Sequence, residues 1–315
     1  MKAFFITSYG GPEVMRYGDL PDPSPARGEV FVAVKAASLN PLDFKIRRGD
    51  FRIITGYRFP KILGSDFAGI VRDVGRGVSG FRPGDSVYGS TLLPLRKQGA
   101  HAGFIPVASG RVRPIPNGIS FEEAASLPVA ALTALNGLRL CGDLADRSVL
   151  INGATGGVGH FALQIAKARG ASVTAVCSTR NTDLARELAA DAVIDYTSQD
   201  VTQARQVFDI VFDAHAGLGF AKASQILTPK GAYANTLPTP GVLAHLLWRK
   251  LIGGRRIVAA NMRARPEDYA EIETMIRERK VRPVIGAIFP LHEAFQAFAA
   301  LEGGRVRGKI VLRME

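Results

Sequence analysis

Residues 149–161 read VLINGATGGVGHF, and they carry the strongest structural signal in the chain. A short apolar strand runs into a glycine cluster, and the cluster runs into a helix with apolar residues at helical spacing. Ala154, Gly156 and Gly159 occupy the three positions of a G-x-G-x-x-G pattern, with alanine replacing the first glycine. The pattern indicates a dinucleotide-binding turn, because Gly156 lets the backbone approach a pyrophosphate and the helix start directs N–H groups at that anion.

Alternating strands and helices surround this turn. We expect strands over 148–152, 172–176, 192–194, 209–213, 231–235 and 256–260, with helices over 157–169 and 183–189. Strands that alternate with helices predict an α/β domain built on a doubly wound, largely parallel sheet.

The N-terminal part has a different sequence pattern. Its short apolar runs, such as 30–34 and 67–71, are separated by glycine and proline. This part is predicted to be mainly β. Ser120 and Glu123 have the spacing of a capping box and open a long helix. After helices over 266–280 and 293–301, a strand over 309–312 is expected to return to the β domain. The predicted domains are therefore 1–119 with 263–315, and 120–262.

Composition sets outer limits on function. The 315 residues are enough for two domains, and 47% apolar with 22% charged residues is typical of a globular enzyme. Two cysteines exclude a disulfide scaffold and a four-thiolate zinc site. The sequence shows neither a signal peptide core nor a membrane-spanning run, so a cytoplasmic location is expected.

The end of the second predicted strand bears on which dinucleotide binds. This strand is followed by Ser178, Thr179 and Arg180, and the next carboxylate is Asp183. Hydroxyls and a guanidinium suit a 2′-phosphate, whereas a carboxylate would suit the ribose diol of NAD. The pattern favours NADP(H), although these residues could also form a solvated loop that caps the next helix.

Several segments taken together resemble the medium-chain dehydrogenase/reductase superfamily, on its zinc-free quinone oxidoreductase (zeta-crystallin-like) branch. The segments, besides the glycine turn, are ASLNPLDFK (37–45), LGSDFAG (63–69), residues 75–89, SLPVAALTA (126–134) and GKIVL (308–312). The resemblance covers essentially the whole chain. It implies a GroES-like, mainly β catalytic domain built from both chain ends, a Rossmann domain between them, and a cofactor cleft at their junction.

The resemblance also separates this chain from the zinc alcohol dehydrogenases. Asn40 stands where those enzymes carry a cysteine, and Ser65 and Asp66 stand where they carry a His-Glu pair. Because Cys141 and Cys177 lie elsewhere, no metal site is expected. Hydride transfer to a quinone or an α,β-unsaturated carbonyl remains as the implied reaction, since such an acceptor spreads the incoming charge over its conjugated carbonyl.

Residue roles follow from the same resemblance. Asn40 is expected to orient the reacting groups, and Lys45 to contact a cofactor phosphate or the developing enolate, unless it is a plain surface lysine. Thr133 matches a threonine near the nicotinamide, or bonds its own helix backbone. Tyr196 matches a tyrosine near the 2′-phosphate, or is a half-buried aromatic residue. The full set of expected cofactor contacts is Thr133, Ala154, Thr155, Gly156, Gly157, Val158, Gly159, Ser178, Arg180 and Tyr196.

The net charge of +12 raises an alternative, an NADPH-binding protein with an RNA-binding or membrane-associated regulatory role. The basic residues are dispersed and lack interleaved aromatic residues, so a nucleic-acid partner is not expected. Residues 240–256 combine an apolar run with Arg249, Lys250, Arg255 and Arg256. We interpret this segment as a subunit contact in a homodimer, with peripheral contact to an anionic membrane as the alternative.

Overall fold

A computed structural model describes residues 1–91, 99–203, 206–236, 255–304 and 306–314. The chain divides into two compact units. Unit 1 comprises Met1–Val129 and Ile285–Glu315, and unit 2 comprises Ala130–Val284. Each unit is considered separately below.

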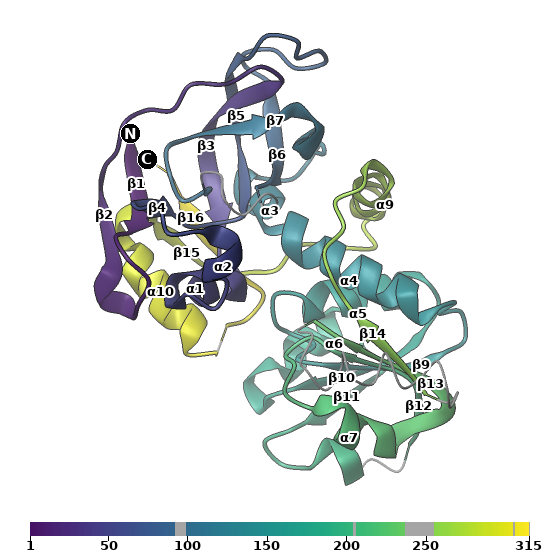
Figure 1. The fold of residues 1–315 in the computed structure, drawn as a ribbon. Coiled ribbons are helices and arrows are strands. Elements are labelled where there is room, and N and C mark those ends of the chain that lie inside the picture. The colour runs from purple at the N-terminus through teal and green to yellow at the C-terminus, as the bar shows by residue number, and fades with distance from the viewer. Residues whose placement is uncertain (92–98, 204–205, 237–254, 305, 315) are drawn as a thin grey trace. The chain divides into compact units, whose positions relative to one another are not determined.

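Unit 2 is built on a parallel sheet with the strand order β11-β10-β9-β12-β13-β14 (Figure 1). Its strands are β9 (Ser148–Asn152), β10 (Ser172–Cys177), β11 (Ala192–Asp195), β12 (Phe208–Asp213), β13 (Leu227–Asn235) and β14 (Arg256–Ala259). The first strand of the sheet, β9, lies in its middle. The next two strands extend the sheet to one edge, and β12, β13 and β14 extend it from β9 to the other edge. This order confirms the predicted doubly wound fold, whose ligand crevice lies where the strand order reverses.

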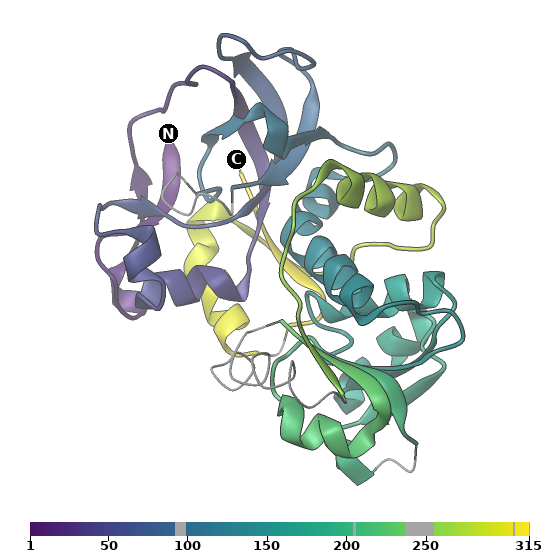
Figure 2. The same ribbon diagram turned by 45° about the vertical axis from the view of Figure 1, so that its right-hand side comes forward.

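The helices of unit 2 are α4 (Pro128–Cys141), α5 (Gly159–Ala168), α6 (Thr182–Glu187), α7 (Gly219–Ala223) and α9 (Pro266–Arg277). Figures 1 and 2 show α4 and α7 on opposite sides of the sheet. A Cβ at Gly137 in α4 would overlap Phe212 of β12, so the helix backbone packs closely on the sheet. On the other face of the sheet, Leu150, Val176 and Val211 are buried in a core cluster that includes Ala223 of α7.

The long helix expected from Ser120 is interrupted. Its predicted capping box is present, because Ser120 Oγ accepts the Glu123 N–H at 3.2 Å and Glu123 accepts the Ser120 N–H at 2.8 Å. The helix α3 (Phe121–Ser126) then ends at Leu127, and α4 begins at Pro128. Proline lacks an N–H group and its ring clashes with the preceding turn, so it starts a helix well but does not continue one.

Unit 1 contains the predicted, mainly β domain. The larger sheet has the order β15-β16-β3-β5-β6-β8, with β7 also paired to β3, and a smaller sheet has the order β2-β1-β4. The strands are β1 (Lys2–Ile6), β2 (Met15–Asp19), β3 (Glu29–Ser38), β4 (Lys61–Ile62), β5 (Asp66–Val74), β6 (Ser86–Ser90), β7 (Phe104–Ala108), β8 (Val112–Pro114), β15 (Ile285–Pro290) and β16 (Lys309–Arg313). Besides α3, its helices are α1 (Pro41–Arg48), α2 (Arg52–Thr55) and α10 (Ala294–Glu302).

The C-terminal strand is an integral part of this unit. β16 pairs antiparallel with β3, so that Val311 lies opposite Ser38. Phe298 of α10 stacks on Phe4 of β1 at a ring-centroid distance of 5.4 Å and enters the same apolar core. The pairing brings Lys309 to the end of β3, next to the segment that carries Asn40.

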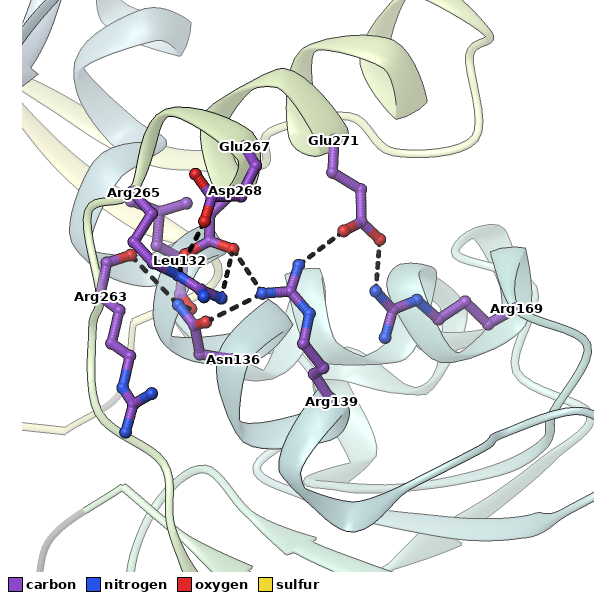
Figure 3. Close-up of polar contacts among 9 residues, drawn as sticks. All are labelled: Leu132, Asn136, Arg139, Arg169, Arg263, Arg265, Glu267, Asp268 and Glu271. Atoms are coloured by element: carbon purple, nitrogen blue, oxygen red, sulfur yellow. Dashed lines mark hydrogen bonds and ion pairs between the residues drawn. The ribbon is translucent and has the colours of Figure 1, made fainter.

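The unit boundaries differ from the predicted 1–119 with 263–315 and 120–262 at both junctions, because α3 packs on β3 and β5 of unit 1 and α9 is tied to the helices of unit 2. Arg139 of α4 pairs with both Asp268 and Glu271 of α9, and Arg169 after α5 pairs with Glu271 (Figure 3). The Asp268 side chain is fully buried. Residues 263–284 therefore belong to unit 2, and the return to the β domain begins at Ile285.

Two further expectations concern membranes and subunits. Among the described residues, no helix has the length and apolarity needed to cross a bilayer. Arg249 and Lys250 lie outside the described residues, so the interpretation of the basic segment stays a prediction. Arg255 and Arg256 are described, and their guanidinium groups bond the backbone carbonyls of Leu227 and Leu140, respectively.

Candidate functional site

The glycine turn joins the carboxyl end of β9 to the start of α5. Gly153 has a φ of 74°, a left-handed conformation that favours glycine. The N–H groups of Gly153 and Ala154 donate to the carbonyl of Val176 in β10 at 3.1 and 3.0 Å. These bonds fix the turn at the carboxyl edge of the sheet, where doubly wound folds bind their ligands.

Gly156 and Gly159 lack side chains for different reasons. A Cβ at Gly159 would overlap the backbone carbonyl of Gly153, so only glycine lets the helix approach the turn. At Gly156 the nearest atom to an added Cβ is the Gly153 oxygen at 3.4 Å, which is an ordinary contact. The protein itself therefore does not require glycine at position 156. The open space beside this backbone fits a ligand that approaches the helix start.

His160 in the first turn of α5 secures the glycine turn. Its Nε2 accepts the N–H of Val284 at 3.2 Å, so Nδ1 carries the proton and donates to the Gly156 carbonyl at 2.9 Å. Gln164, one turn later, bonds both the carbonyl and the N–H of Arg282 at 2.9 Å. The segment that leaves unit 2 thus buttresses the helix start.

A second support lies under the carboxyl edge of the sheet. Buried Asp213 accepts hydrogen bonds from the Asn152 amide at 2.8 Å, the Tyr233 hydroxyl at 2.8 Å and the Leu218 N–H at 3.0 Å. Burial, followed by the charge of Asp213, raises the pKa of Tyr233, so its hydroxyl stays protonated as a donor. The network links the ends of β9, β12 and β13, and it holds the edge in a fixed shape.

The residues after β10 and those at the end of β11 form the proposed specificity segment, and they include an acidic residue absent from the predicted set. Ser178 is half-buried, whereas Arg180 and Tyr196 are exposed, the latter by 59%. Asp195, at the end of β11, accepts the Thr179 hydroxyl at 2.6 Å and the Thr197 hydroxyl at 2.7 Å. The Thr179 hydrogen bond, followed by those from Thr197, lowers the pKa of Asp195, so its carboxylate is charged and bonded to the residue that precedes Arg180.

Thr133, the tenth predicted cofactor residue, lies in the second turn of α4 and is 7% exposed. It belongs to unit 2, as do the nine residues of the glycine turn and the specificity segment. The other nine gather at the carboxyl edge of the sheet, from the ends of β9, β10 and β11. Asn40 and Lys45 belong to unit 1.

Asn40 lies in a buried polar cluster of unit 1. Its Nδ2 donates to Asp66 at 2.9 Å, and its Oδ1 accepts the Lys309 ammonium at 2.7 Å. Its backbone N–H donates to Asp43 at 2.7 Å. All four residues are at most 3% exposed. The orientation of the Asn40 amide is thus fixed by charged neighbours on both sides.

The protonation states of the cluster follow from its bonds. Burial raises the pKa of Asp66 and lowers that of Lys309, but each charge opposes the shift of the other. Asp66 also accepts the Ser38 hydroxyl and the Val129 N–H, and Lys309 donates to the carbonyl of Leu39 at 3.0 Å. Donors around the carboxylate and acceptors around the ammonium favour the charged pair.

Asp43 is the other acid of this cluster. Burial raises the pKa of Asp43 to about 7, with a smaller contribution from the nearby charge of Asp66. Its Oδ1 has no hydrogen-bond partner among the described residues. Near neutral pH a proton on Asp43 leaves the Asp66 and Lys309 pair electrically balanced.

Lys45 lies in α1, five residues after Asn40, and is half-buried. Burial lowers the pKa of its ammonium, and the charge of Asp50 partly restores it. It is therefore neither a fully solvated lysine nor part of the buried cluster.

A zinc ion does not fit the residues at the positions considered above. Asn40, Ser65 and Asp66 supply one carboxylate, and the Lys309 ammonium already lies 3.9 Å from it. In the described ranges, no group of three or more His, Cys, Asp or Glu side chains is arranged to hold a metal ion. A second cation beside Lys309 would face like-charge repulsion.

Two family models match the chain. Residues 26–134 match the alcohol dehydrogenase GroES-like domain, and residues 188–312 match a model described as zinc-binding dehydrogenase. The first match covers β3 to β8 of unit 1 and the start of α4, and the second covers β11 to β14, α9 and most of the C-terminal return.

Known proteins of similar sequence and structure are oxidoreductases. The mitochondrial NAD(P)H oxidoreductase RTN4IP1 of Mus musculus is 35% identical, over 100% of this chain and 89% of its own length. The 2-methylene-furan-3-one reductase of Solanum lycopersicum is 34% identical, over 99% and 79%. The solved quinone oxidoreductase from Coxiella burnetii has a TM-score of 0.91 and 32% identity, and covers 100% of this chain and 99% of its own.

The chain therefore belongs to the medium-chain dehydrogenase/reductase superfamily, in its zinc-free quinone oxidoreductase-like branch. Its fold is a GroES-like domain combined with a dinucleotide-binding Rossmann domain, and its relatives identify it as an oxidoreductase acting on a small molecule. The alternative of a regulatory NADPH-binding protein in place of an enzyme is not favoured by these relatives.

Three residues with defined places in these sites were not predicted: Asp195, His160 and Lys309. A lysine at the head of the buried strand Lys309–Arg313 is itself an unusual signal, because lysine is rarely buried without a partner. For Asp195 and His160 no comparable signal exists in the sequence, since each acts through a tertiary contact.

Proposed function

We propose that the chain is an NADPH-dependent reductase that transfers a hydride to a quinone or an α,β-unsaturated carbonyl and needs no zinc. The observation that carries this proposal is the glycine turn, with open space beside Gly156 at the start of α5. Bound NADPH would supply the hydride from its nicotinamide ring.

The residues of this chain would bind the cofactor, orient the reacting groups and donate hydrogen bonds to them. The turn from Ala154 to Gly159 would hold the pyrophosphate through backbone N–H groups. Arg180, supported by Ser178 and Tyr196, would bind the 2′-phosphate, because a guanidinium matches phosphate oxygens in a bidentate fork. Thr133 would lie near the nicotinamide.

Asn40 and Lys45 are the proposed catalytic residues. The Asn40 amide nitrogen uses one hydrogen for Asp66. Its second hydrogen is the one that could orient a carbonyl of the substrate or cofactor. Lys45 would donate to a cofactor phosphate or to the enolate oxygen on which negative charge develops, and its lowered pKa makes it a better proton donor than a solvated lysine.

The test is turnover by purified protein with a panel of quinones and enones. The fall in NADPH absorbance measures the rate. We expect NADPH oxidation that depends on one of these acceptors. The reaction should persist in a metal chelator, and it should be faster with NADPH than with NADH. If the protein binds neither dinucleotide, the proposal fails as a whole. Oxidation that stops in the chelator and returns with added zinc would contradict its zinc-free part.

A cytoplasmic location and a homodimer remain predictions. β14 is at one end of the described parallel sheet, with β13 as its neighbour on one side. Such an edge suits pairing with a second copy of the strand. Light scattering after size-exclusion chromatography should give the mass of two chains of 33.7 kDa. The mass of a single chain would contradict the homodimer.

A further inference from the structure

An exposed apolar surface surrounds the short helix α2 in unit 1. Ile53, Ile54 and Tyr57 are 83%, 53% and 68% exposed. In the part of the chain that the structure describes, no other large apolar side chain is as exposed as Ile53. Single exposed apolar residues are common, but three within five residues form a patch with a candidate function.

This patch is held in place from the protein side. The Tyr9 hydroxyl bonds both Thr55 Oγ1, at 2.6 Å, and the carbonyl of Gly56. Thr55 is buried, and Lys61 donates to its carbonyl at 2.9 Å. The Tyr9 ring also packs edge-on against Phe59 at 5.0 Å. The inner side of α2 is therefore anchored, while its isoleucines face outward.

Positive charge surrounds the patch. Between Asp43 and Asp66 the chain has six basic residues and one acidic residue, Asp50, although Arg47 and Arg48 both pair with Glu302. Arg52 and Arg58 flank the isoleucines and are exposed. An isologous contact with a second copy would bring these arginines against themselves, which disfavours self-association through this face.

The geometry points to an anionic lipid surface as the partner of this patch. Ile53, Ile54 and Tyr57 would enter the boundary between headgroups and acyl chains, while Arg52 and Arg58 would contact lipid phosphates and carboxylates. Exposed apolar side chains flanked by arginines favour binding at the interface between lipid headgroups and acyl chains. This contact is separate from the proposed hydride transfer and does not depend on it.

Co-sedimentation of the full chain with phosphatidylcholine vesicles, with and without phosphatidylserine, tests the proposal. We expect binding only to vesicles that contain phosphatidylserine, and loss of binding in high salt. Ile53→Ser should lower the partition coefficient on the order of tenfold, because apolar surface no longer enters the bilayer. Arg58→Ala should lower it about fivefold.

Matched controls come from the same unit. Ile288 is an isoleucine with 42% exposure in β15, and Arg76 is an exposed arginine. Ile288→Ser and Arg76→Ala should leave the partition coefficient unchanged. Circular dichroism and the thermal midpoint would verify that each variant is folded, since all four side chains are exposed.

Four results would overturn the proposal. The first is equal binding to both vesicle types, or none to either. The second is an equal effect of Ile53→Ser and Ile288→Ser. The third is loss of binding in an Arg249→Glu, Lys250→Glu double variant but not in Ile53→Ser, which would move the contact to the segment 249–250. Altered KM for a water-soluble quinone in Ile53→Ser, with vesicle binding unchanged, would instead assign α2 to the substrate.

Discussion

At the scale of single residues, two glycines three positions apart carry opposite predictions. Gly159→Ala should destabilise unit 2, because its Cβ would overlap the Gly153 carbonyl. Gly156→Ala should leave the thermal midpoint unchanged, since its Cβ meets only that oxygen at 3.4 Å. It should nevertheless raise the dissociation constant of NADPH about tenfold, a loss of about 1.4 kcal/mol.

Thermal unfolding and a fluorescence titration with NADPH measure the two effects. Each variant serves as the control of the other, because the chemical change is the same. Unchanged NADPH affinity in a folded Gly156→Ala protein would show that the open space is not where the pyrophosphate binds.

Asp195 carries a prediction about cofactor choice. Its charged carboxylate is bonded to Thr179, the residue before the proposed 2′-phosphate contact Arg180, so it should oppose a phosphate and favour a ribose diol. Asp195→Asn should therefore raise the ratio of kcat/KM for NADPH over NADH about tenfold. Arg180→Ser should lower that ratio.

Asp200 is the matched control, since its carboxylate accepts the N–H and hydroxyl of Thr202 as Asp195 does those of Thr197. Asp200→Asn should leave the ratio unchanged. If the ratio of kcat/KM for NADPH over NADH is the same in the Asp195 and Asp200 variants, Asp195 has no role in cofactor selection.

Lys309 is predicted to be essential for the stability of unit 1. Lys309→Met leaves the buried carboxylate of Asp66 without its cation, which should lower the free energy of unfolding by about 3–5 kcal/mol. Lys35→Met, at an exposed lysine of β3, should change it little. Urea denaturation measures both. Adding Asp66→Asn to Lys309→Met should recover part of the loss, and no recovery would contradict the charged pair.

At the scale of elements, the attachment of α9 depends on charge. Burial alone would raise the pKa values of Asp268 and Glu271, but the hydrogen bonds from arginines outweigh it and hold both below their ordinary values of 3.8 and 4.5. A lowered pKa in the folded state contributes stability above the ordinary pKa, and this stability disappears as the pH falls through the folded value.

Arg139→Met should therefore lower the free energy of unfolding by about 2 kcal/mol at neutral pH, because buried Asp268 loses its bond from Arg139 but keeps those from Arg265. The further loss on acidification below pH 4.5 should be smaller than in the natural protein. Arg186→Met removes an exposed i,i+3 pair with Asp183 and is the control. Identical acid unfolding curves for Arg139→Met and the natural protein would contradict this role.

The elements of unit 2 were predictable because short apolar runs alternate with helical patterns around one glycine turn. β9 was predicted with its observed bounds, and α5 with ends that differ by one or two residues. The break at Pro128 was missed, because the alanine-rich pattern on both sides is continuous. The affiliation of α9 was missed because it depends on Arg139 meeting Asp268, 129 residues away.

The candidate site was predictable only where local sequence carries it. The glycine turn and Asn40 belong to short motifs that the sequence displays directly. Lys309 meets Asn40 across 269 residues, through the pairing of β16 with β3, and Asp195 meets Thr179 through the pairing of β11 with β10. Such partners are fixed by strand register, which no local pattern specifies.

At the scale of the whole molecule, all ten proposed cofactor contacts lie in unit 2. NADPH at roughly a hundred times its dissociation constant should stabilise the folded chain by about 2.7 kcal/mol. Hydrogen exchange should show slower exchange at the glycine turn and at the end of β10. Calorimetry with Gly156→Ala at the same NADPH concentration is the control and should show a smaller shift. Slower exchange confined to 1–129 would contradict the assignment.

The pairing of β16 with β3 also sets an order of events during synthesis. Unit 2 is one continuous segment and is complete when residue 284 has been made. Unit 1 must wait for residues 309–313, and until then Asp66 has no ammonium to neutralise it. Unit 2 can therefore close without the C-terminal strand, whereas unit 1 cannot. Newly made chains are therefore most exposed to chaperones and proteases through their N-terminal β-strands.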